Sequence, residues 1–302
     1  MGESNPRRPG RVLHPGAGAD LFVADRVPVE GPLADVASHL WCVRWDRPLR
    51  TPWTAQILSD PAVHLTVEES GPVSTATRRP PPLHGHAMPA ALVHGPVTRL
   101  WTVELPLRGR TSGVAFRPGG FAALFDLDVS SVAGRVVRAE ELLPGADPHR
   151  PVLELQQAVL AEPEEDRRRR ILLDWLGEVH RAAGDRIAGD PAYRTVTAAV
   201  ALMEQREQVR VEQVAAAVHC SPRTLQRWFL RHVGVPPLQV LRRRRLQDAT
   251  AALDAGEEDL ARLAAELGWA DHAHFTRDFR AVVGVPPEAY RRGVGAGRQP
   301  TG

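Results

Sequence analysis

The pattern of apolar and polar residues changes near the middle of the chain. Before that point, apolar positions come in short stretches bounded by Pro, Gly and His, as over residues 40–45, 63–68, 99–105 and 112–118. Such stretches are typical of β-strands. One short helix is expected after Pro118, where the sequence GGFAALF places its apolar residues on one face. The N-terminal part is therefore predicted to be rich in β-structure.

From Pro151 onward, apolar residues recur at spacings of three and four, which favours amphipathic helices. Asp190 followed by Pro191 is typical of an N-cap and the first residue of a helix. The predicted class is α+β, with a β-rich N-terminal domain, a helical connector and an all-α C-terminal domain. The predicted boundaries are a flexible segment over 1–20, a sensor or dimerisation domain over 21–145, the connector over 146–190, the all-α domain over 191–293 and a disordered tail over 294–302.

The sequence GVPP occurs twice, at 234–237 and 284–287. Each copy follows a short helix, a break and a second helix with an apolar stripe, which is a helix–turn–helix pattern. In the first copy Ser221 and Pro222 are typical of an N-cap and the first helical residue, and in the second Gly268 supplies the turn. Because helices commonly end at Gly and proline stops them, each GVPP is interpreted as the end of a second helix.

These paired motifs resemble the AraC/XylS family of bacterial transcription regulators. The resemblance covers residues 193–292 and is carried by SPRTLQRWF in the first copy and LAAELGWADHAHFTRDFRAVVGVPPEAYR in the second. It implies a sequence-specific DNA-binding transcription regulator whose partner is double-stranded DNA. A small-molecule effector, RNA polymerase and a second copy of the chain are further candidate partners. The N-terminal stretches WCVRWDRP and GVAFRPGGFAALF are similar to uncharacterised domains of some actinobacterial members, which carry no known ligand.

Polar residues on the two second helices are the candidate DNA contacts. Arginine pairs bidentately with guanine and glutamine with adenine, and a recognition helix presents such side chains opposite its core stripe. Residues 220–250 hold seven arginines and one acidic residue, a balance that suits phosphate binding. The second copy carries fewer strong donors. The predicted contacts are Ser221, Arg223, Thr224, Gln226, Arg227, Arg231, Arg242, His272, His274, Thr276 and Arg277.

Four tryptophans lie in the predicted strands, where they either line an apolar ligand cavity or fill the core. They are Trp41, Trp45, Trp53 and Trp101. The N-terminal domain is therefore a candidate sensor of a small molecule. A domain that serves only as an interaction module, without a ligand, is the alternative.

Two other groups of residues raise the question of chemistry. His84, His86 and His94 lie close in sequence, but no acid or cysteine stands near them in the chain, so no metal site is predicted. Cys42 raises the alternative of a DNA-repair alkyltransferase. A methyl-accepting cysteine needs a lowered pKa, usually from zinc or a basic partner, and a zinc-type cysteine cluster is missing from a chain with two cysteines. Neither enzyme activity nor a cofactor is predicted.

Composition refines this picture in two respects. The net charge of the 302 residues is +2, so affinity for a polyanion depends on local clustering of arginine. Of two runs of four arginines, the one at 167–170 is interpreted as a solvated helix face with intrahelical ion pairs. No apolar run approaches the roughly 18 residues of a membrane span, and the first residues lack the apolar stretch of a signal peptide. The expected location is the cytoplasm, with no membrane partner.

Overall fold

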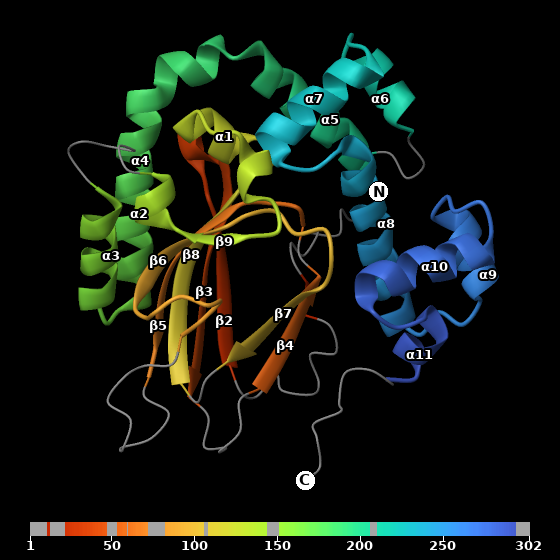
Figure 1. Ribbon diagram of the computed structural model, residues 1–302, viewed down its shortest axis with the longest axis horizontal. Coiled ribbons are helices and arrows are strands. Elements are labelled where there is room, and N and C mark those ends of the chain that lie inside the picture. The colour runs from red at the N-terminus through yellow and green to blue at the C-terminus, as the bar shows by residue number, and fades with distance from the viewer. Residues whose placement is uncertain are drawn as a thin grey trace.

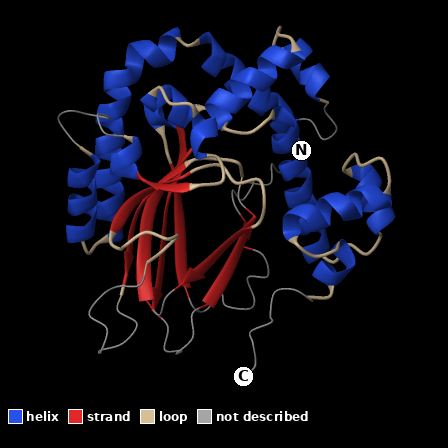
Figure 2. Ribbon diagram, in the orientation of Figure 1, coloured by secondary structure: helices blue, strands red, loops and turns tan. Residues whose placement is uncertain are grey.

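The computed structural model describes residues 11–12, 22–46, 53–58, 60–71, 82–105, 108–143, 151–205 and 210–293. The class is α+β, as predicted: strands occupy the first part of the chain and long helices the second. Figure 2 shows the strands gathered together with helices beside them. Within the segment 1–20, which was expected to be flexible, Arg11–Val12 forms a short strand. The rest of that segment and the tail 294–302 lie outside the described residues.

In the described part of the chain, the strands form two antiparallel sheets. The larger has the order β2-β3-β8-β5-β6-β9 and the smaller the order β1-β4-β7. All four stretches predicted to be strands are confirmed as parts of β3, β5, β7 and β8. The bounds are β1 Arg11–Val12, β2 Phe22–Pro28, β3 Ala37–Asp46, β4 Trp53–Leu58, β5 His64–Ser70, β6 Ala90–His94, β7 Trp101–Leu105, β8 Arg108–Phe116 and β9 Val136–Arg138.

The helices fall into a group that covers the larger sheet and a group that follows it in sequence (Figure 1). The first group is α1 Gly120–Phe125, α2 Ala139–Leu142, α3 Val152–Ala161 and α4 Glu165–Gly189. The second is α5 Pro191–Gln205, α6 Val211–Ala217, α7 Pro222–Val233, α8 Pro237–Asp254, α9 Leu260–Glu266, α10 His272–Val283 and α11 Pro287–Arg291. Two 3₁₀ turns, η3 Gly31–Asp35 and η4 Val129–Val132, complete the order.

The two faces of the larger sheet have different surroundings, and β5 shows why. Successive side chains of a strand point to opposite faces. Leu65 and Val67 belong to the core that the sheet shares with the covering helices, where Trp175 of α4 is 1% exposed. Thr66 and Glu68 point to the opposite face and are nevertheless buried, at 0% and 2% exposed. That face therefore carries buried polar groups, which need partners of their own.

Arg168 of α4, which lies in the run interpreted from the sequence as a solvated face, bonds to the larger sheet. The side chain of Arg168 is 2% exposed. Its Nη2 donates to Oε1 of Glu69 on β5 at 2.8 Å, and its Nε donates to the carbonyl of Glu162 at 2.6 Å. The interpretation of 167–170 as a solvated face is therefore wrong for Arg168, because a helix residue that faces a sheet is buried whatever its charge.

The C-terminal part contains the two predicted helix–turn–helix units, α6–α7 and α9–α10. The N-caps are Ser221, whose Oγ accepts from the amide of Thr224 at 3.1 Å, and Asp271, whose carboxylate accepts from the amide of His274 at 2.7 Å. Helix α7 ends at Gly234 with φ of 80°, and α10 at Gly284 with φ of 89°. Both are left-handed, so the interpretation of GVPP as a helix end is confirmed.

The N-terminal domain packs directly against both units. A Cβ added at Gly234 would lie 2.7 Å from Cγ of Pro96 and 2.9 Å from Cγ1 of Val129, so the end of α7 is in close contact with the sheet domain. At the second unit, the amide of Leu100 donates to the carbonyl of Val282 at 3.1 Å. Leu58 of β4 is fully buried in the core of that unit.

The two glycines of the GVPP repeat give a matched test of this packing. Gly234→Ala and Gly284→Ala both place a side chain at a left-handed residue, which costs about 1–2 kcal/mol. The space around Gly284 is open, whereas the new methyl group at Gly234 would overlap Pro96 and Val129. We expect Gly234→Ala to lower the free energy of unfolding by at least about 1 kcal/mol more than Gly284→Ala. Equal losses in denaturant unfolding of the full chain would contradict the interdomain contact.

Candidate nucleic-acid interface

Helix α7 presents a polar face to solvent. Arg223, Gln226 and Arg227 are exposed, while Leu225 and Phe229 on the other side of the helix are fully buried in the core of the first unit. Arginine and glutamine are the side chains that pair bidentately with guanine and adenine. The exposed face of α7 therefore has the chemistry of a base-reading surface.

The remaining residues predicted on the first unit have partners within the protein. The hydroxyl groups of Ser221 and Thr224 lie 2.9 Å apart, and the former also caps α7. Arg231 forms an ion pair with Asp126 at 2.7 Å, although both side chains are about half exposed. Arg231 lies one turn after Arg227 on the same face of α7 and is also in contact with the N-terminal domain through Asp126.

The second unit offers fewer side chains for contacts on α10. Nε2 of His272 lies 3.3 Å from Glu288, and Nε2 of His274 lies 3.4 Å from Asp278. The hydroxyl of Thr276 is buried and has no hydrogen-bond partner among the described residues. Arg277 is exposed. That this copy is the weaker reader stays a prediction; the imidazoles of His272 and His274 are each 43% exposed and lie near carboxylates, and the hydroxyl of Thr276 is buried.

The arginine run of α8 has partners inside the protein. Arg242 donates from two nitrogens to Asp278 of α10, at 3.2 and 2.5 Å. The other three arginines bond to backbone carbonyls: Arg243 to Arg99 at 3.2 Å, Arg244 to Met203, and Arg245 to Gly268 at 3.3 Å. Burial lowers the pKa of Arg243 to about 10, which leaves it charged at neutral pH. The predicted DNA contact at Arg242 is therefore a contact between α8 and α10 in this structure.

The carboxylate of Asp278 accepts hydrogen bonds both from α8 and from the turn of the second unit. Its side chain is 11% exposed, and besides Arg242 it accepts from Nε1 of Trp269 at 3.1 Å. Burial acts to raise the pKa of Asp278, but the hydrogen bonds from Arg242 and Trp269 outweigh it, so the net pKa is lowered. The carboxylate stays ionised and ties the linking helix to the helix that follows the turn.

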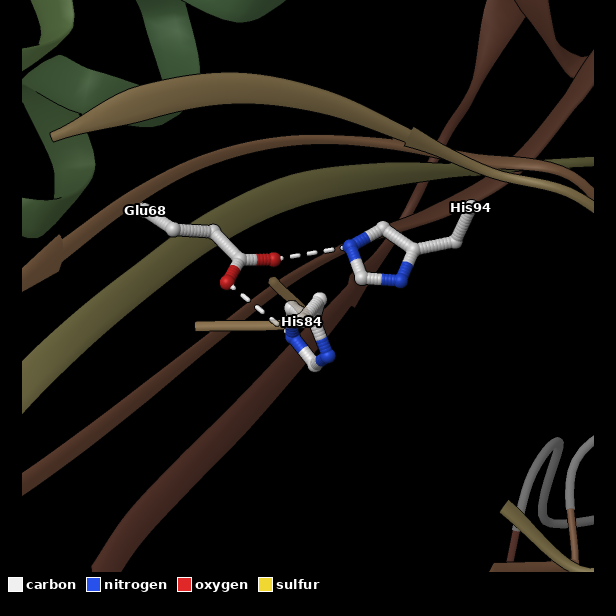
Figure 3. A group of neighbouring side chains, drawn as sticks. All are labelled: Glu68, His84 and His94. Atoms are coloured by element: carbon white, nitrogen blue, oxygen red, sulfur yellow. Dashed lines mark hydrogen bonds and ion pairs between the residues drawn. The ribbon is translucent and has the colours of Figure 1, made fainter. Parts of the chain in front are cut away.

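In the N-terminal domain, three ligand-type side chains converge on the polar face of the larger sheet (Figure 3). Oε1 of Glu68 lies 2.8 Å from Nε2 of His94, and Oε2 lies 3.3 Å from Nε2 of His84. The sequence argument against a metal site rested on the absence of a nearby acid. That premise fails in the fold, because Glu68 of β5 and His94 of the neighbouring β6 lie on the same face of the sheet and their side chains meet, although His94 itself is paired with His64. The signal in the sequence was an acid on the polar side of a strand that alternates between polar and apolar residues.

His86, two residues after His84, points away from Glu68. Its Nε2 lies 3.1 Å from the carbonyl of Val136 on β9. His84 and Gly85 form a two-residue turn in which Leu83 and His86 exchange backbone hydrogen bonds of 3.0 and 2.8 Å. The turn separates the two imidazoles, which therefore do not point to one side.

Of the predicted tryptophans, Trp45 lies in the core and Trp101 lies beside His84 and His94. Trp45 is 3% exposed and packs among Leu83, Met88 and Leu92, so it is a core residue. The ring of Trp101 lies 5.5 Å from that of His84 and 5.8 Å from that of His94, measured between centroids. Nε1 of Trp41 donates to Nδ1 of His64 at 3.1 Å, and the side chain of Trp53 lies outside the described residues.

Burial keeps the imidazoles of His64 and His39, in the same domain as Glu68, neutral at pH 7. Burial lowers the pKa of His64 to about 3, with a further lowering from His94. Burial likewise lowers the pKa of His39 to about 4. For Glu68, burial acts to raise the pKa, but hydrogen bonds from His84 and His94 outweigh it and the net pKa is lowered. The site therefore combines one ionised carboxylate with nitrogen donors.

Comparisons with known proteins match the two parts of the chain separately. Residues 214–293 match a family described as a helix-turn-helix domain, and residues 25–138 match a domain of unknown function, DUF6597. A relative from Escherichia fergusonii, the HTH-type transcriptional activator RhaS, is 34% identical over 93 residues. The C-terminal part of this chain is an AraC-type helix–turn–helix domain.

Two further matches fall on the AraC-type domain. An uncharacterised HTH-type transcriptional regulator from Haemophilus influenzae is 30% identical over 102 residues, 33% of this chain and 34% of the relative. The match to RhaS covers 31% of this chain and 34% of RhaS, so the chain spans about a third of the length of these relatives. The DNA-binding domain of AdpA, solved in complex with a target DNA, is 33% identical, with 38% of this chain and all of that chain covered and a TM-score of 0.31.

The alternative of an alkyltransferase fused to an AraC-type domain finds no activated thiol at Cys42. Its side chain is buried, at 5% exposed. Burial raises the pKa of Cys42 and Glu165 raises it further, which outweighs the lowering by Arg169. A nucleophilic cysteine requires the opposite shift. Separately, none of the helices that the structure describes has the length and apolar character needed to cross a membrane.

Asp278 of the AraC-type domain provides a test of how its two halves are joined. Asp278→Asn keeps the size of the side chain but removes the charge that Arg242 and Trp269 bond to, and we expect it to lower the free energy of unfolding by about 1–3 kcal/mol at pH 7. The lowered folded-state pKa means that the stabilisation is present above the unfolded pKa of about 3.9 and is lost as pH falls through the folded value. The difference from wild type should therefore shrink below about pH 4.

The control is Asp248→Asn, because Asp248 is 54% exposed and lies 3.8 Å from Arg244. An exposed pair of this kind contributes under about 1 kcal/mol. Denaturant unfolding of both variants between pH 3 and 8 gives the comparison. If the two variants lose equal amounts of unfolding free energy at every pH, the carboxylate of Asp278 is not the acceptor that joins α8 to α10.

Proposed function

We propose that the protein is a sequence-specific DNA-binding transcription regulator whose AraC-type domain reads DNA in the cytoplasm and whose N-terminal domain responds to an effector. The observation that carries the proposal is the exposed face of Arg223, Gln226 and Arg227 on the second helix of a helix–turn–helix unit. The names of both curated relatives, a transcriptional activator and a transcriptional regulator, support it.

The contacts within the protein divide the predicted DNA-binding residues by role. Arg223, Gln226 and Arg227 are the proposed base readers, because they are exposed. Arg242 and Arg231 hold the units in place through Asp278 and Asp126. On α10, Arg277 is an exposed cation that remains a candidate for a phosphate or base contact. The stronger sequence information should thus lie under α7.

The rigid link between the units limits where α10 can reach. Helix α8 has 18 residues, a length of about 27 Å, and runs from one unit to the other (Figure 1). Two recognition helices that enter the major groove on one face of a duplex lie about 34 Å apart. A shorter link favours bent DNA or a second unit that contacts the backbone. A binding site of about 15–20 base pairs per monomer follows from this geometry.

An effector bound in the N-terminal domain has a direct route to the DNA-binding units. The end of α7 is packed against Pro96 and Val129, and α10 accepts a backbone hydrogen bond from Leu100. A change in the sheet domain therefore acts on both units without an intervening linker. RNA polymerase and a second copy of the chain stay predictions, as partners that a regulator of this type would need.

The proposal is tested by selecting sequences from random duplex DNA with the full chain and then measuring affinities on single-base variants of the selected site. Arg227→Ala should cost about 1–3 kcal/mol at one base pair and relax the preference there. Gln226→Ala should act at a different position. Arg181→Ala, which removes an exposed arginine of α4, is the control and should leave affinity unchanged. A selection that enriches no sequence would refute the function, and uniform losses at every position would reassign both residues to phosphate contacts.

A further inference from the structure

The group Glu68, His84 and His94, here named the triad, has the composition of a metal site. Its three ligand atoms, one carboxylate oxygen and two imidazole nitrogens, lie within 4.8 Å of one another. Ligand atoms of a tetrahedral zinc ion with bonds of about 2.1 Å are about 3.4 Å apart, so small side-chain movements suffice. Two histidines and one carboxylate are a ligand set that binds first-row divalent transition metals and leaves coordination positions open.

The three side chains come from separate elements and are aimed at one point. Glu68 lies within β5, His94 ends β6, and His84 is in the turn that precedes β6. His84 has φ of 53°, a left-handed conformation that is uncommon for residues other than glycine. A backbone held in such a conformation at a point where functional groups meet is typical of binding sites. Both histidines direct the same atom, Nε2, to the carboxylate.

The burial of the triad also fits a cation. The side chain of Glu68 is 3% exposed, whereas those of His84 and His94 are 10% and 16% exposed. An ionised carboxylate in such a place must be compensated by charge or hydrogen bonds. The hydroxyl of Thr66 donates to Oε1 of Glu68 at 2.8 Å and so orients the carboxylate. The slightly exposed histidines leave an edge through which an ion can enter.

We propose that the triad binds a first-row divalent transition metal ion, and that this ion is the effector of the N-terminal domain. The second part rests on the proposed function as a DNA-binding regulator. The route from the ion to the DNA-binding units starts at Trp101, whose ring packs on both imidazoles. The two residues before it contact the DNA-binding domain: the carbonyl of Arg99 accepts from Arg243, and the amide of Leu100 donates to Val282.

Ion binding changes what the imidazoles can do. A ligating nitrogen must be deprotonated, so Nε2 of each histidine gives up any proton it shares with Glu68 and turns its lone pair to the metal. The two rings are then held in orientations set by the ion, and Trp101 must follow the surfaces it packs on. Because Arg99 and Leu100 are adjacent in the chain, the start of β7 transmits that shift to α8 and α10.

The metal site is tested on the full chain after removal of bound metal with a chelator. Titration with Zn²⁺ in a calorimeter should give one ion per chain with a Kd of about 1 µM or tighter, and Co²⁺ should give a visible absorption spectrum with nitrogen ligation. His84→Asn removes a ligand while asparagine tolerates the left-handed backbone. His84→Asn and Glu68→Gln should each weaken Zn²⁺ binding at least about 100-fold.

The matched control is His86→Asn, two residues away in the same turn, whose imidazole bonds to Val136 instead. It should bind Zn²⁺ as wild type does. Circular dichroism and thermal unfolding of each variant separate loss of a ligand from loss of the fold. Absence of stoichiometric binding to the wild-type chain, or equal binding by wild type, His84→Asn and Glu68→Gln, would overturn the site and leave the triad a hydrogen-bonded network.

The regulatory role is tested with the DNA site selected by the full chain. Zn²⁺ should change the affinity for this site at least about 5-fold in wild type and in His86→Asn, and not in His84→Asn. Trp101→Leu should still bind the ion but lose the change in DNA affinity. Binding of the ion with unchanged DNA affinity would overturn the effector role. If no DNA is bound at any metal concentration, the proposed function fails, and the calorimetric result still decides the metal site.

Discussion

Four consecutive arginines on α8 bond to parts of the molecule that are distant from one another in the sequence. Neighbouring residues of a helix point about 100° apart, so the run 242–245 reaches in different directions: to Asp278 in the second unit, and to the carbonyls of Arg99, Met203 and Gly268. Buried guanidinium groups must be bonded, since an unpaired charge costs far more than a lost contact. Among the four, Arg243 is the buried one, at 3% exposed, and through the whole run one helix contacts both helix–turn–helix units and the sheet domain.

This arrangement places the sheet domain in direct contact with the AraC-type domain. The polar face of the larger sheet carries the triad, Trp101 covers it, and the residues before Trp101 touch α8 and α10. On the other side, α7 ends against Pro96 and Val129. Each recognition helix is thus in contact with the domain that precedes it, and a ligand there has only short distances over which to act.

The sequence predicted what is encoded locally. The N-cap Ser221 and the left-handed ends at Gly234 and Gly284 need no partner outside their own helices, and the resemblance to a family located the paired motifs. What it missed depends on residues distant in sequence. Glu68 joins His94 across 26 residues through strand pairing, and Arg242 meets Asp278 across 36. A run of arginines looks alike on a solvated face and at a crowded junction, because only the fold decides which carbonyls lie within reach.

The central claim is that the sheet domain and both helix–turn–helix units form one mechanical unit through α8 and the residues before β7. Differential scanning calorimetry of the full chain tests it most directly, because domains without a substantial interface unfold separately. The account predicts a single transition whose calorimetric and van't Hoff enthalpies agree. Two resolved transitions, with the C-terminal one unchanged when residues 191–293 are studied alone, would contradict it.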